Sequence, residues 1–289
     1  MALFLPSTRR GGSKIDRWVI IKFRPFPFCV PVGPARDRRV SDFELDHGLA
    51  DALEPISARG WPPRELVQLG GWRLQASDGF SGRANACWPI GAPDRSMSAA
   101  ITAVEAWYQA RKLAPIFRPA DIPQTGPLRQ ALAEQGYAPR TPTLMMTGLL
   151  TPGDAAGVAL SPDPDEGFSS VFLAGAPSPG AAAERIDTLT RIPAPRAFAR
   201  IDRDGAAVAI GAVAIEAGWA GFFGMRTLAE HRRQGLARAV LTGLTDFALA
   251  AGATRAYLQV EAANSPAVAL YQRLGFRTAY EYRYWERAE

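Results

Sequence analysis

EHRRQGLARAV, residues 230–240, is the stretch from which the fold of this chain can be worked out. It places two arginines, a glutamine and a glycine directly before an apolar run with helical spacing, and no acid lies between Arg232 and Arg238. Helix starts usually carry Asp, Glu, Ser or Thr, because the free N–H groups there bear partial positive charge. A helix that begins with cations instead is expected to hold an anion from outside the chain.

The turn into this helix has the features of a phosphate site. Backbone N–H groups at a helix start point outward and, together with the helix dipole, favour a bound anion. Gly235 permits close approach of the backbone, and the small Ala237 keeps side-chain bulk away. Arg232, Arg233 and Arg238 add charge-assisted donors. The pattern R-x-x-G-x-A is neither a Walker A motif nor G-x-G-x-x-G, and taken alone it also fits a solvated basic surface.

The other hydrophobic patterns alternate between strand and helix spacing, which predicts an α/β protein. The second half predicts two short helices, then three strands in a meander, a helix, a strand, a helix and a last strand, at residues 168–174, 181–191, 196–228, 234–252, 254–262, 264–276 and 277–285. The first half predicts helices and strands in the segments 43–60, 71–89, 97–112, 127–137 and 141–150. The Pro-, Gly- and Asp-rich residues 151–167 are expected to form a linker with one short strand at most.

The two halves of the chain repeat each other at a spacing of 139 residues. This offset pairs Gly136 with Gly275 and Pro127 with Pro266, and it lays residues 97–112 over the helix that follows the anion-binding turn without a gap. A register that holds from the meander to the last strand is poorly explained by chance. We therefore predict two copies of one β-β-β-α-β-α-β unit.

The copies are expected to form two domains, a degenerate one at residues 41–150 and an intact one at residues 151–289. The difference between them lies at the helix start, where Ser96 stands opposite Gly235. The first copy is therefore expected to have lost the anion site that the second retains.

The positive charge of the chain is concentrated in its first residues. Of a formal net charge of +5, residues 1–39 hold nine Lys/Arg and two acids, so the remainder carries −2. We therefore expect no nucleic-acid partner, and that option rests on the basic head alone. The proline-rich segment 1–40 is expected to be disordered or a non-native extension. No apolar run has secretory or transmembrane length, so we expect no membrane partner and a cytoplasmic location.

Two cysteines and two histidines offer little material for disulfides or metal. Cys29 and Cys87 cannot make a disulfide framework, and His47 and His231 lie far apart in the sequence. We therefore expect no metal cofactor. The sequence allows a monomer or a homodimer.

Two segments, MRTLAEHRRQGLARAVL (225–241) and LQVEAANSPAVALYQRLGF (258–276), resemble the GNAT superfamily of N-acetyltransferases. The resemblance covers most of residues 196–289. It implies a tandem α/β fold with mixed sheets, acetyl-CoA as co-substrate, and transfer of its acetyl group to a primary amine. The whole chain is more loosely similar to bacterial GNAT enzymes with a degenerate first half, among them short N-acetylglutamate synthases.

The same resemblance implies which residues bind acetyl-CoA. The turn at residues 232–238 would hold the pyrophosphate, the backbone of residues 225–227 would pair with the pantetheine arm, and Asn264 would hydrogen-bond the cofactor. The complete set is Met225, Arg226, Thr227, Arg232, Arg233, Gln234, Gly235, Leu236, Ala237, Arg238, Asn264 and Tyr271.

Tyr271 is the expected donor of a proton to the leaving thiolate. It lies seven residues after Asn264, two helical turns on, so both side chains occupy one face of the helix. A phenol with a pKa near ~10 suits a thiolate whose own acid has a pKa of about 8.5. The alternative is a core tyrosine with a tethered hydroxyl. Glu216 and Glu261 are candidate bases or anchors for the amine, and both also fit solvated strand positions.

Arg83, Asn85 and Glu261 are the expected acceptor-binding residues, with Arg83 on a carboxylate. A strand-edge arginine and a turn asparagine are the plainer interpretation of the first two. Gln259 stands where ribosomal-protein alanine acetyltransferases carry a catalytic glutamate, which argues against acetylation of protein N-termini. We expect an acetyl-CoA-dependent N-acetyltransferase acting on a small-metabolite amine, such as the amino acid glutamate. A non-catalytic acyl-CoA sensor and a protein or peptide N-acetyltransferase are the alternatives.

Overall fold

Two sheets organise the computed structural model, which describes residues 47–287. Predictions for residues 1–46 lie outside this range. The helices are α1 (His47–Arg59), α2 (Met97–Gln109), α3 (Gly126–Glu134), α4 (Glu166–Ala174), α5 (Pro179–Thr190), α6 (Leu236–Ala250) and α7 (Ser265–Arg273). The strands are β1 (Glu65–Leu69), β2 (Trp72–Ala76), β3 (Cys87–Pro89), β4 (Tyr137–Leu149), β5 (Ala159–Ser161), β6 (Arg196–Arg203), β7 (Ala206–Glu216), β8 (Trp219–Thr227), β9 (Arg255–Glu261) and β10 (Arg277–Arg287). Short 3-10 turns η1 (Gly82–Ala84), η2 (Pro123–Thr125) and η3 (Ala229–His231) connect some of them.

The helices of the two halves recur at the predicted spacing. Met97 begins α2 and Leu236 begins α6, and the nine-residue helices α3 and α7 are also 139 residues apart. The helix starts differ in their capping. The Ser96 hydroxyl accepts a hydrogen bond from the Ala99 N–H at 3.4 Å, whereas Gly235 gives α6 no side-chain cap. The open start of α6 leaves its N–H groups for another partner.

The first half departs from the predicted pattern in two places. Strand β1 lies outside the segment 71–89 in which the sequence predicts strands, although the predicted β-β-β unit calls for a third strand; its sequence ELVQL lies mostly exposed at a sheet edge and lacks a buried face. The predicted repeat unit also calls for a strand between α2 and α3, and this prediction is wrong for the first half. Only isolated bridges occur there, at Phe117 and Ala120.

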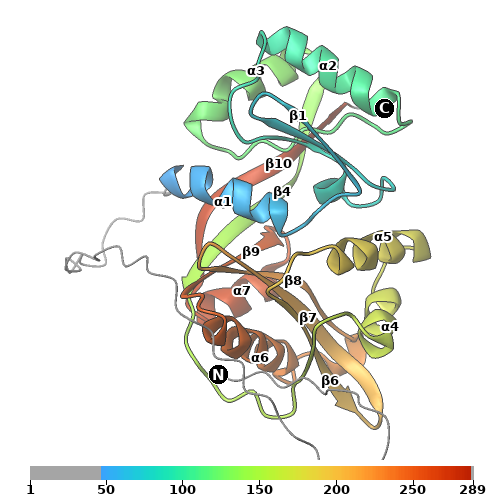
Figure 1. Cartoon of the computed structure of the whole chain (residues 1–289), viewed down its shortest axis with the longest axis vertical. Coiled ribbons are helices and arrows are strands. Elements are labelled where there is room, and N and C mark those ends of the chain that lie inside the picture. Colours follow the sequence, from blue (N-terminus) through green and yellow to red (C-terminus); the bar gives the residue numbers. More distant parts are fainter. Residues whose placement is uncertain (1–46, 288–289) are drawn as a thin grey trace, which may run out of the picture. The chain divides into compact units, whose positions relative to one another are not determined.

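Strand β4 belongs by sequence to the first half and by pairing to the larger sheet. That sheet has the order β10-β4-β9-β8-β7-β6-β5, so β4 separates the two last strands of the second half. Met145 at its middle pairs with Tyr280 of β10 on one side and with Gln259 of β9 on the other. Figure 1 shows β4 and β10 running together toward β1 and α2. The domain limits at residues 41–150 and 151–289 stay a prediction, but the limit at residue 150 does not separate the two sheets.

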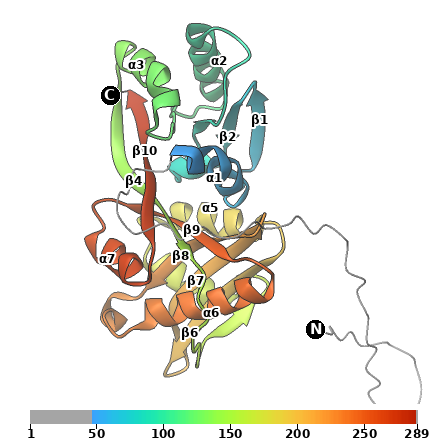
Figure 2. The same ribbon diagram turned by 90° about the vertical axis from the view of Figure 1, so that its left-hand side faces the viewer.

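Helices cover both faces of the larger sheet around its meander β6–β8. Helices α6 and α7 lie on one side and α4 and α5 on the other in Figure 1, and Figure 2 looks onto the α6 side. Phe222 of β8 packs in the apolar cluster with α6, whereas Phe223 packs in the cluster with α4 and α5. This alternation is the normal result of the strand pleat.

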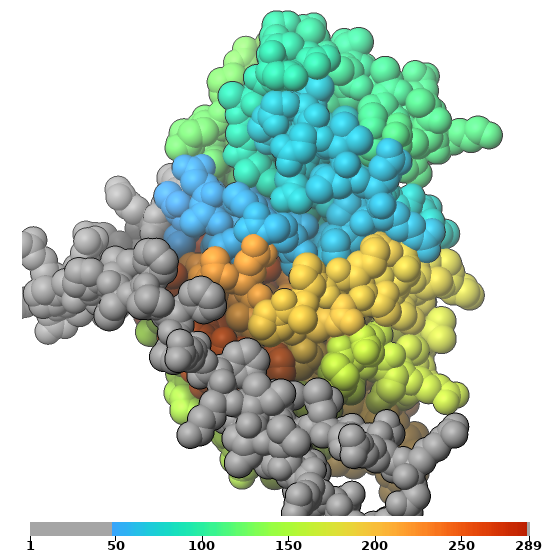
Figure 3. Space-filling model, in the orientation of Figure 1, coloured from blue at the N-terminus to red at the C-terminus, as the bar shows by residue number. Residues whose placement is uncertain are grey.

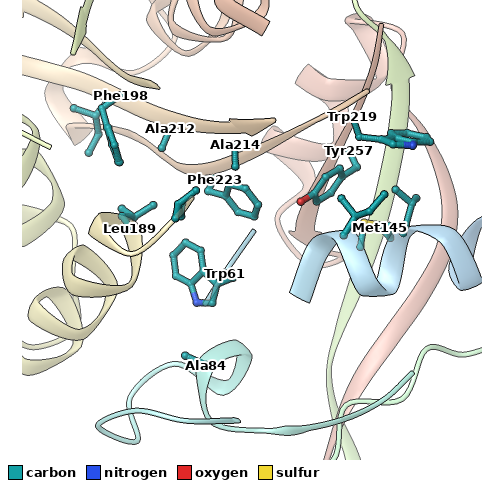
Figure 4. Packing of buried hydrophobic residues seen from close by; sticks show 14 of the residues in the cluster. Trp61, Ala84, Met145, Leu189, Phe198, Ala212, Ala214, Trp219, Phe223 and Tyr257 are labelled. Carbon is teal, nitrogen blue, oxygen red and sulfur yellow. The ribbon is translucent and has the colours of Figure 1, made fainter. Parts of the chain in front are cut away.

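The first half contacts the α5 face of the sheet. Arg64 pairs with Asp187 at 2.7 Å, and Arg191 donates to the Pro62 carbonyl at 3.1 Å. In Figure 3 the blue surface of this half meets the yellow surface of α5 directly. Trp61 faces Phe223 there, with ring centroids 5.8 Å apart (Figure 4). Residues of the first half therefore reach the strand on which the expected cofactor site lies.

Candidate active site

A β-bulge in β8 opens the sheet at the centre of the site. Ile210 of β7 pairs with Arg226, yet Ala212 pairs with Phe223, so β8 holds one extra residue between them. Gly224 lies in this bulge with φ +60°, a conformation that favours glycine. The parallel pairing of β8 with β9 ends at Phe222. Beyond that point the two strands separate, and their facing backbone edges border a cavity.

The cavity has a volume of about 650 Å³ and is built from both halves of the chain. Its walls come from the η1 turn, α4, α5, the separated ends of β8 and β9, the start of α7, and the strands β4 and β10. The sequence-predicted residues that line it are Arg83, Met225, Arg226, Glu261, Asn264 and Tyr271. Residues from distant parts of the sequence are thus assembled around one space.

The turn before α6 has the backbone expected of an anion site. Gly235 adopts a left-handed conformation with φ 81° and ψ −3°, and Arg233 also has a positive φ of 60°. The residues from Arg232 to Gly235 are exposed, and Arg232 Nε donates to the Thr227 carbonyl at 3.3 Å. This contact ties the turn to the end of β8, although the turn does not itself line the cavity. Thr227 likewise lies outside the cavity lining.

Tyr271 and Asn264 occupy the same side of the cavity, as their spacing predicts. The Tyr271 side chain is 8% exposed, and burial raises its pKa to about 12. In the structure from residue 47 to 287 its hydroxyl has no hydrogen-bond partner, while its ring packs on Phe276. Asn264 Oδ1 accepts from the Ala267 N–H at 3.3 Å and caps α7. The tyrosine hydroxyl is therefore available to a ligand, and the asparagine amide N–H₂ group remains for one.

Glu216 lies in a different place from Tyr271. It pairs with Arg59 and lines a second cavity of about 400 Å³ together with Arg73 and Tyr257. Glu216 faces Trp219 at the beginning of β8, whereas the bulge lies beyond Phe222. The structure thus does not bring this carboxylate to the cavity, and Glu261 at the end of β9 is the predicted acid that lines it.

Asn85 also lies apart from the cavity lining, in the loop that carries Arg83. Its Oδ1 accepts from the N–H groups of Ser77 at 2.7 Å and Gly79 at 3.1 Å, so it shapes the loop. Arg83 does line the cavity, and its guanidinium lies 5.1 Å from the Trp61 ring centroid. The plainer interpretation of a turn asparagine therefore fits Asn85.

Several residues that complete the walls carry no signal in the sequence. They lie outside both motifs, in a loop, in helices α4 and α5 and in strand β10: Trp61, Phe172, Arg185, Tyr282, Tyr284 and Glu286. Gln259 also lines the cavity, where its Oε1 accepts from the Tyr282 hydroxyl at 2.8 Å. No spacing rule connects these positions, because the fold of both halves brings them together.

Glu184 of α5 fixes the loop that carries Arg83. Its fully buried carboxylate accepts hydrogen bonds from the N–H groups of Phe80 at 3.1 Å and Ser81 at 2.6 Å, and from Asn85 Nδ2 at 3.1 Å. Three donors thus converge on one carboxylate across the contact between the two halves. This arrangement holds Arg83 at the cavity.

We expect Glu184→Gln to loosen this loop, because a side-chain N–H₂ group would then face backbone N–H donors. Unfolding free energy should fall by about 1–3 kcal/mol, the usual effect of an unmatched buried polar group. The Michaelis constant for an acceptor held by Arg83 should rise several-fold, with kcat nearly unchanged. Denaturant unfolding and steady-state kinetics measure both. The exposed Glu134→Gln is the matched control, and equal behaviour of the two variants would contradict the assigned role.

A match to a family model assigns this fold and cavity to an N-acetyltransferase of the GNAT type. The family described as "Probable histone acetyltransferase Rv0428c C-terminal" matches residues 50–285, and the chain belongs to this acetyltransferase family. The expected GNAT membership is thereby confirmed.

Individual relatives agree with this assignment. The chain is 26% identical over 257 residues to the uncharacterized N-acetyltransferase YobR of Bacillus subtilis (strain 168), covering 80% of this chain and 96% of that protein. A GCN5-related N-acetyltransferase from Kribbella flavida shares the fold with a TM-score of 0.62 at 21% identity, over 84% of this chain and 97% of its own. A tandem GNAT protein from the clavulanic acid biosynthesis pathway aligns with a TM-score of 0.52 at 16% identity, over 82% and 86% of the two chains. The tandem fold thus has a solved counterpart.

Residues 47–287 contain neither a membrane-spanning helix nor a metal-binding cluster. No helix there combines the length and apolar character needed to cross a bilayer. No group of three or more His, Cys, Asp and Glu side chains there is placed to hold a metal ion.

Proposed function

We propose that this N-acetyltransferase uses acetyl-CoA to acetylate the primary amine of a small metabolite that also carries an anionic group, such as an amino acid. The observation that carries the proposal is the joint cavity: Tyr271 and Asn264 lie on one side of it, and Arg83 of the other half closes it. A cavity of about 650 Å³ is in the range of small-molecule sites.

The residues around the bulge fit acetyl-CoA, which would supply the acetyl group as a thioester. The uncapped start of α6 and the left-handed Gly235 offer outward N–H groups for a pyrophosphate. The separated backbone of β8 from residue 223 onward offers donors and acceptors for an extended amide-containing chain. Both features lie in one continuous segment of the chain, since β8 leads through η3 into this turn.

Tyr271 is the proposed proton donor to the leaving sulfur. Its hydroxyl is unpartnered in the described structure, and its pKa, raised by burial to about 12, leaves the proton in place at physiological pH, as the ordinary value also would. Glu261 is the proposed anchor for the acceptor ammonium, because it is the predicted carboxylate that lines the same cavity. Arg83 is the proposed partner of the acceptor anion, through its planar, two-pronged guanidinium.

A protein acceptor is the second candidate, because the description of the family names a histone acetyltransferase. Histone tails are cationic, and the positive side of this cavity would repel them. This charge argument favours the small anionic acceptor.

A thiol-release assay with acetyl-CoA and a panel of amines tests the proposal. The panel contains amino acids, polyamines, aminoglycosides and lysine-containing peptides. We expect turnover of a zwitterionic small amine and little turnover of cationic peptides. Acetylation of peptides alone would reject the small acceptor, and binding of acetyl-CoA without turnover of any amine would instead indicate a sensor.

A further inference from the structure

The cavity gathers arginines that lack acidic partners. In the part of the chain that the structure describes, eleven arginines are ion-paired, and most of the remainder are exposed. Four arginines within residues 47–287 are neither exposed nor paired with a carboxylate: Arg73, Arg83, Arg185 and Arg226. Three of these four line the main cavity, and we name Arg83, Arg185 and Arg226 the arginine triad.

The guanidinium groups of Arg83 and Arg226 are held in place by uncharged contacts. Arg226 Nη1 donates to the Gly175 carbonyl at 2.6 Å, and its guanidinium lies 4.6 Å from the Phe172 ring centroid. Arg83 lies over Trp61, and its buried Nε has no hydrogen-bond partner in the described structure. Aromatic rings and one carbonyl orient these cations but do not neutralise them.

Two members of the triad, Arg185 and Arg226, lie close enough for their like charges to repel. Burial lowers the pKa of Arg226, and the positive charge of Arg185 lowers it further. Two half-buried cations that repel each other raise the free energy of the site, and an anion bound between them would lower it. The absence of an acidic partner within residues 47–287 leaves that role to a ligand.

Separate structural devices place each member of the triad. The loop of Arg83 is fixed by Glu184, and Arg185 is the next residue of the same helix. The bulge at Gly224 changes the side-chain alternation of β8, so that Arg226 reaches Phe172 on the α4 side while Met225 packs toward α6.

The carboxylates that line the cavity are on other strands, Glu261 on β9 and Glu286 on β10.

We infer that the arginine triad binds the anionic end of an acceptor that carries two negative charges, either as two carboxylates or as one phosphate ester. This inference rests on the proposed function and names the substrate class for the same site. The amine then lies toward Tyr271 and Glu261, and the anionic end lies toward α5. Guanidinium groups suit both anions, because their fork of N–H donors matches carboxylate and phosphate oxygens.

Two matched acceptor pairs test the inference. Glutamate and glutamine have the same shape and differ by one negative charge, and phosphoethanolamine and ethanolamine distinguish the phosphate source. We expect kcat/KM for at least one dianionic member to exceed that of its partner by at least about tenfold, since the unmatched partner leaves the cations unpaired. The pair that discriminates identifies the source of the second charge. Equal kcat/KM within both pairs would overturn the dianion while leaving acetyl transfer itself intact.

A binding measurement separates this inference from turnover. Glutarate and pentanoate have the same carbon count, lack an amine, and are titrated against the full chain by calorimetry. We expect glutarate or, in the phosphate case, propyl phosphate to bind at least about tenfold more tightly than pentanoate. Arg185→Gln should remove most of this preference, whereas the exposed Arg203→Gln should retain it. A preference that survives Arg185→Gln, or none in the original chain, would reject the triad as the anion site. A loss of acetyl-CoA binding instead would assign Arg185 to the cofactor and also reject it.

Discussion

Tyr271→Phe should lower kcat about 10²-fold and leave the Michaelis constants for acetyl-CoA and acceptor nearly unchanged. The substitution removes only the hydroxyl, while the ring can keep its packing against Phe276, whose centroid lies 6.1 Å away. Because the hydroxyl has no hydrogen-bond partner in residues 47–287, its loss leaves no buried group unmatched. The expected defect is therefore in proton transfer and not in folding or binding.

The pH dependence provides a second test of Tyr271. Burial raises its pKa to about 12, so the phenol keeps its proton over the whole neutral and mildly alkaline range. Ionisation of this group should therefore cause no loss of kcat below about pH 11. Tyr137→Phe, which removes a hydroxyl bonded to Glu105 in the other half, is the matched control. If the Tyr271 variant keeps full kcat, the leaving group takes its proton from elsewhere.

Arg118→Met should lower the free energy of unfolding by about 3–5 kcal/mol. Arg118 is fully buried, and its Nη1 donates to Glu54 Oε2 at 2.5 Å. Its guanidinium lies between the rings of Trp88 and Tyr282, at 3.8 and 3.5 Å from their centroids. Burial opposes the charge, yet Glu54 and Tyr282 hold the pKa of Arg118 above its ordinary value. Removing the cation leaves the Glu54 carboxylate buried without a counter-ion.

A double variant separates the charge effect from lost packing. Arg118→Met with Glu54→Leu removes both charges, so much of the stability should return, although the Tyr280 hydroxyl loses its acceptor. Urea unfolding of the single and double variants measures the difference. The exposed Arg140→Met is the control for methionine itself. A single variant that loses less than about 1 kcal/mol, or a double variant as unstable as the single, would contradict the stated cause.

The sequence predicted those parts of the site that depend on local chain geometry. The left-handed turn before α6 follows from Gly235, and Tyr271 and Asn264 line one cavity because of their spacing on a helix. The segment-by-segment prediction missed strand β1, because an exposed edge segment carries a weak burial pattern. The predicted repeat unit also called for a strand between α2 and α3 that does not form. The repeat also revealed the helix register but not the position of β4, because equivalent sequences do not say which strands pair.

The remaining parts of the site depend on contacts between distant segments. The sequence offers Glu216 as a candidate base or amine anchor, but the bulge that opens the cavity lies farther along β8. Arg185 had no motif around it, and only the packing of α5 against the first half gives it a place at the cavity. The extra residue at Gly224 cannot be seen in the alternation of side chains, although it decides where Arg226 points.

The position of β4 also bears on whether the second repeat could evolve without the first. A gene that encoded the second repeat alone would specify β9 and β10 without the strand that joins them. The exposed backbone edge of β9 would then invite association with other chains. Selection therefore has reason to retain the first repeat for its strand. Deletion of the first repeat would therefore cost the larger sheet a strand, while substitutions in its cavity-facing loop would leave the sheet intact.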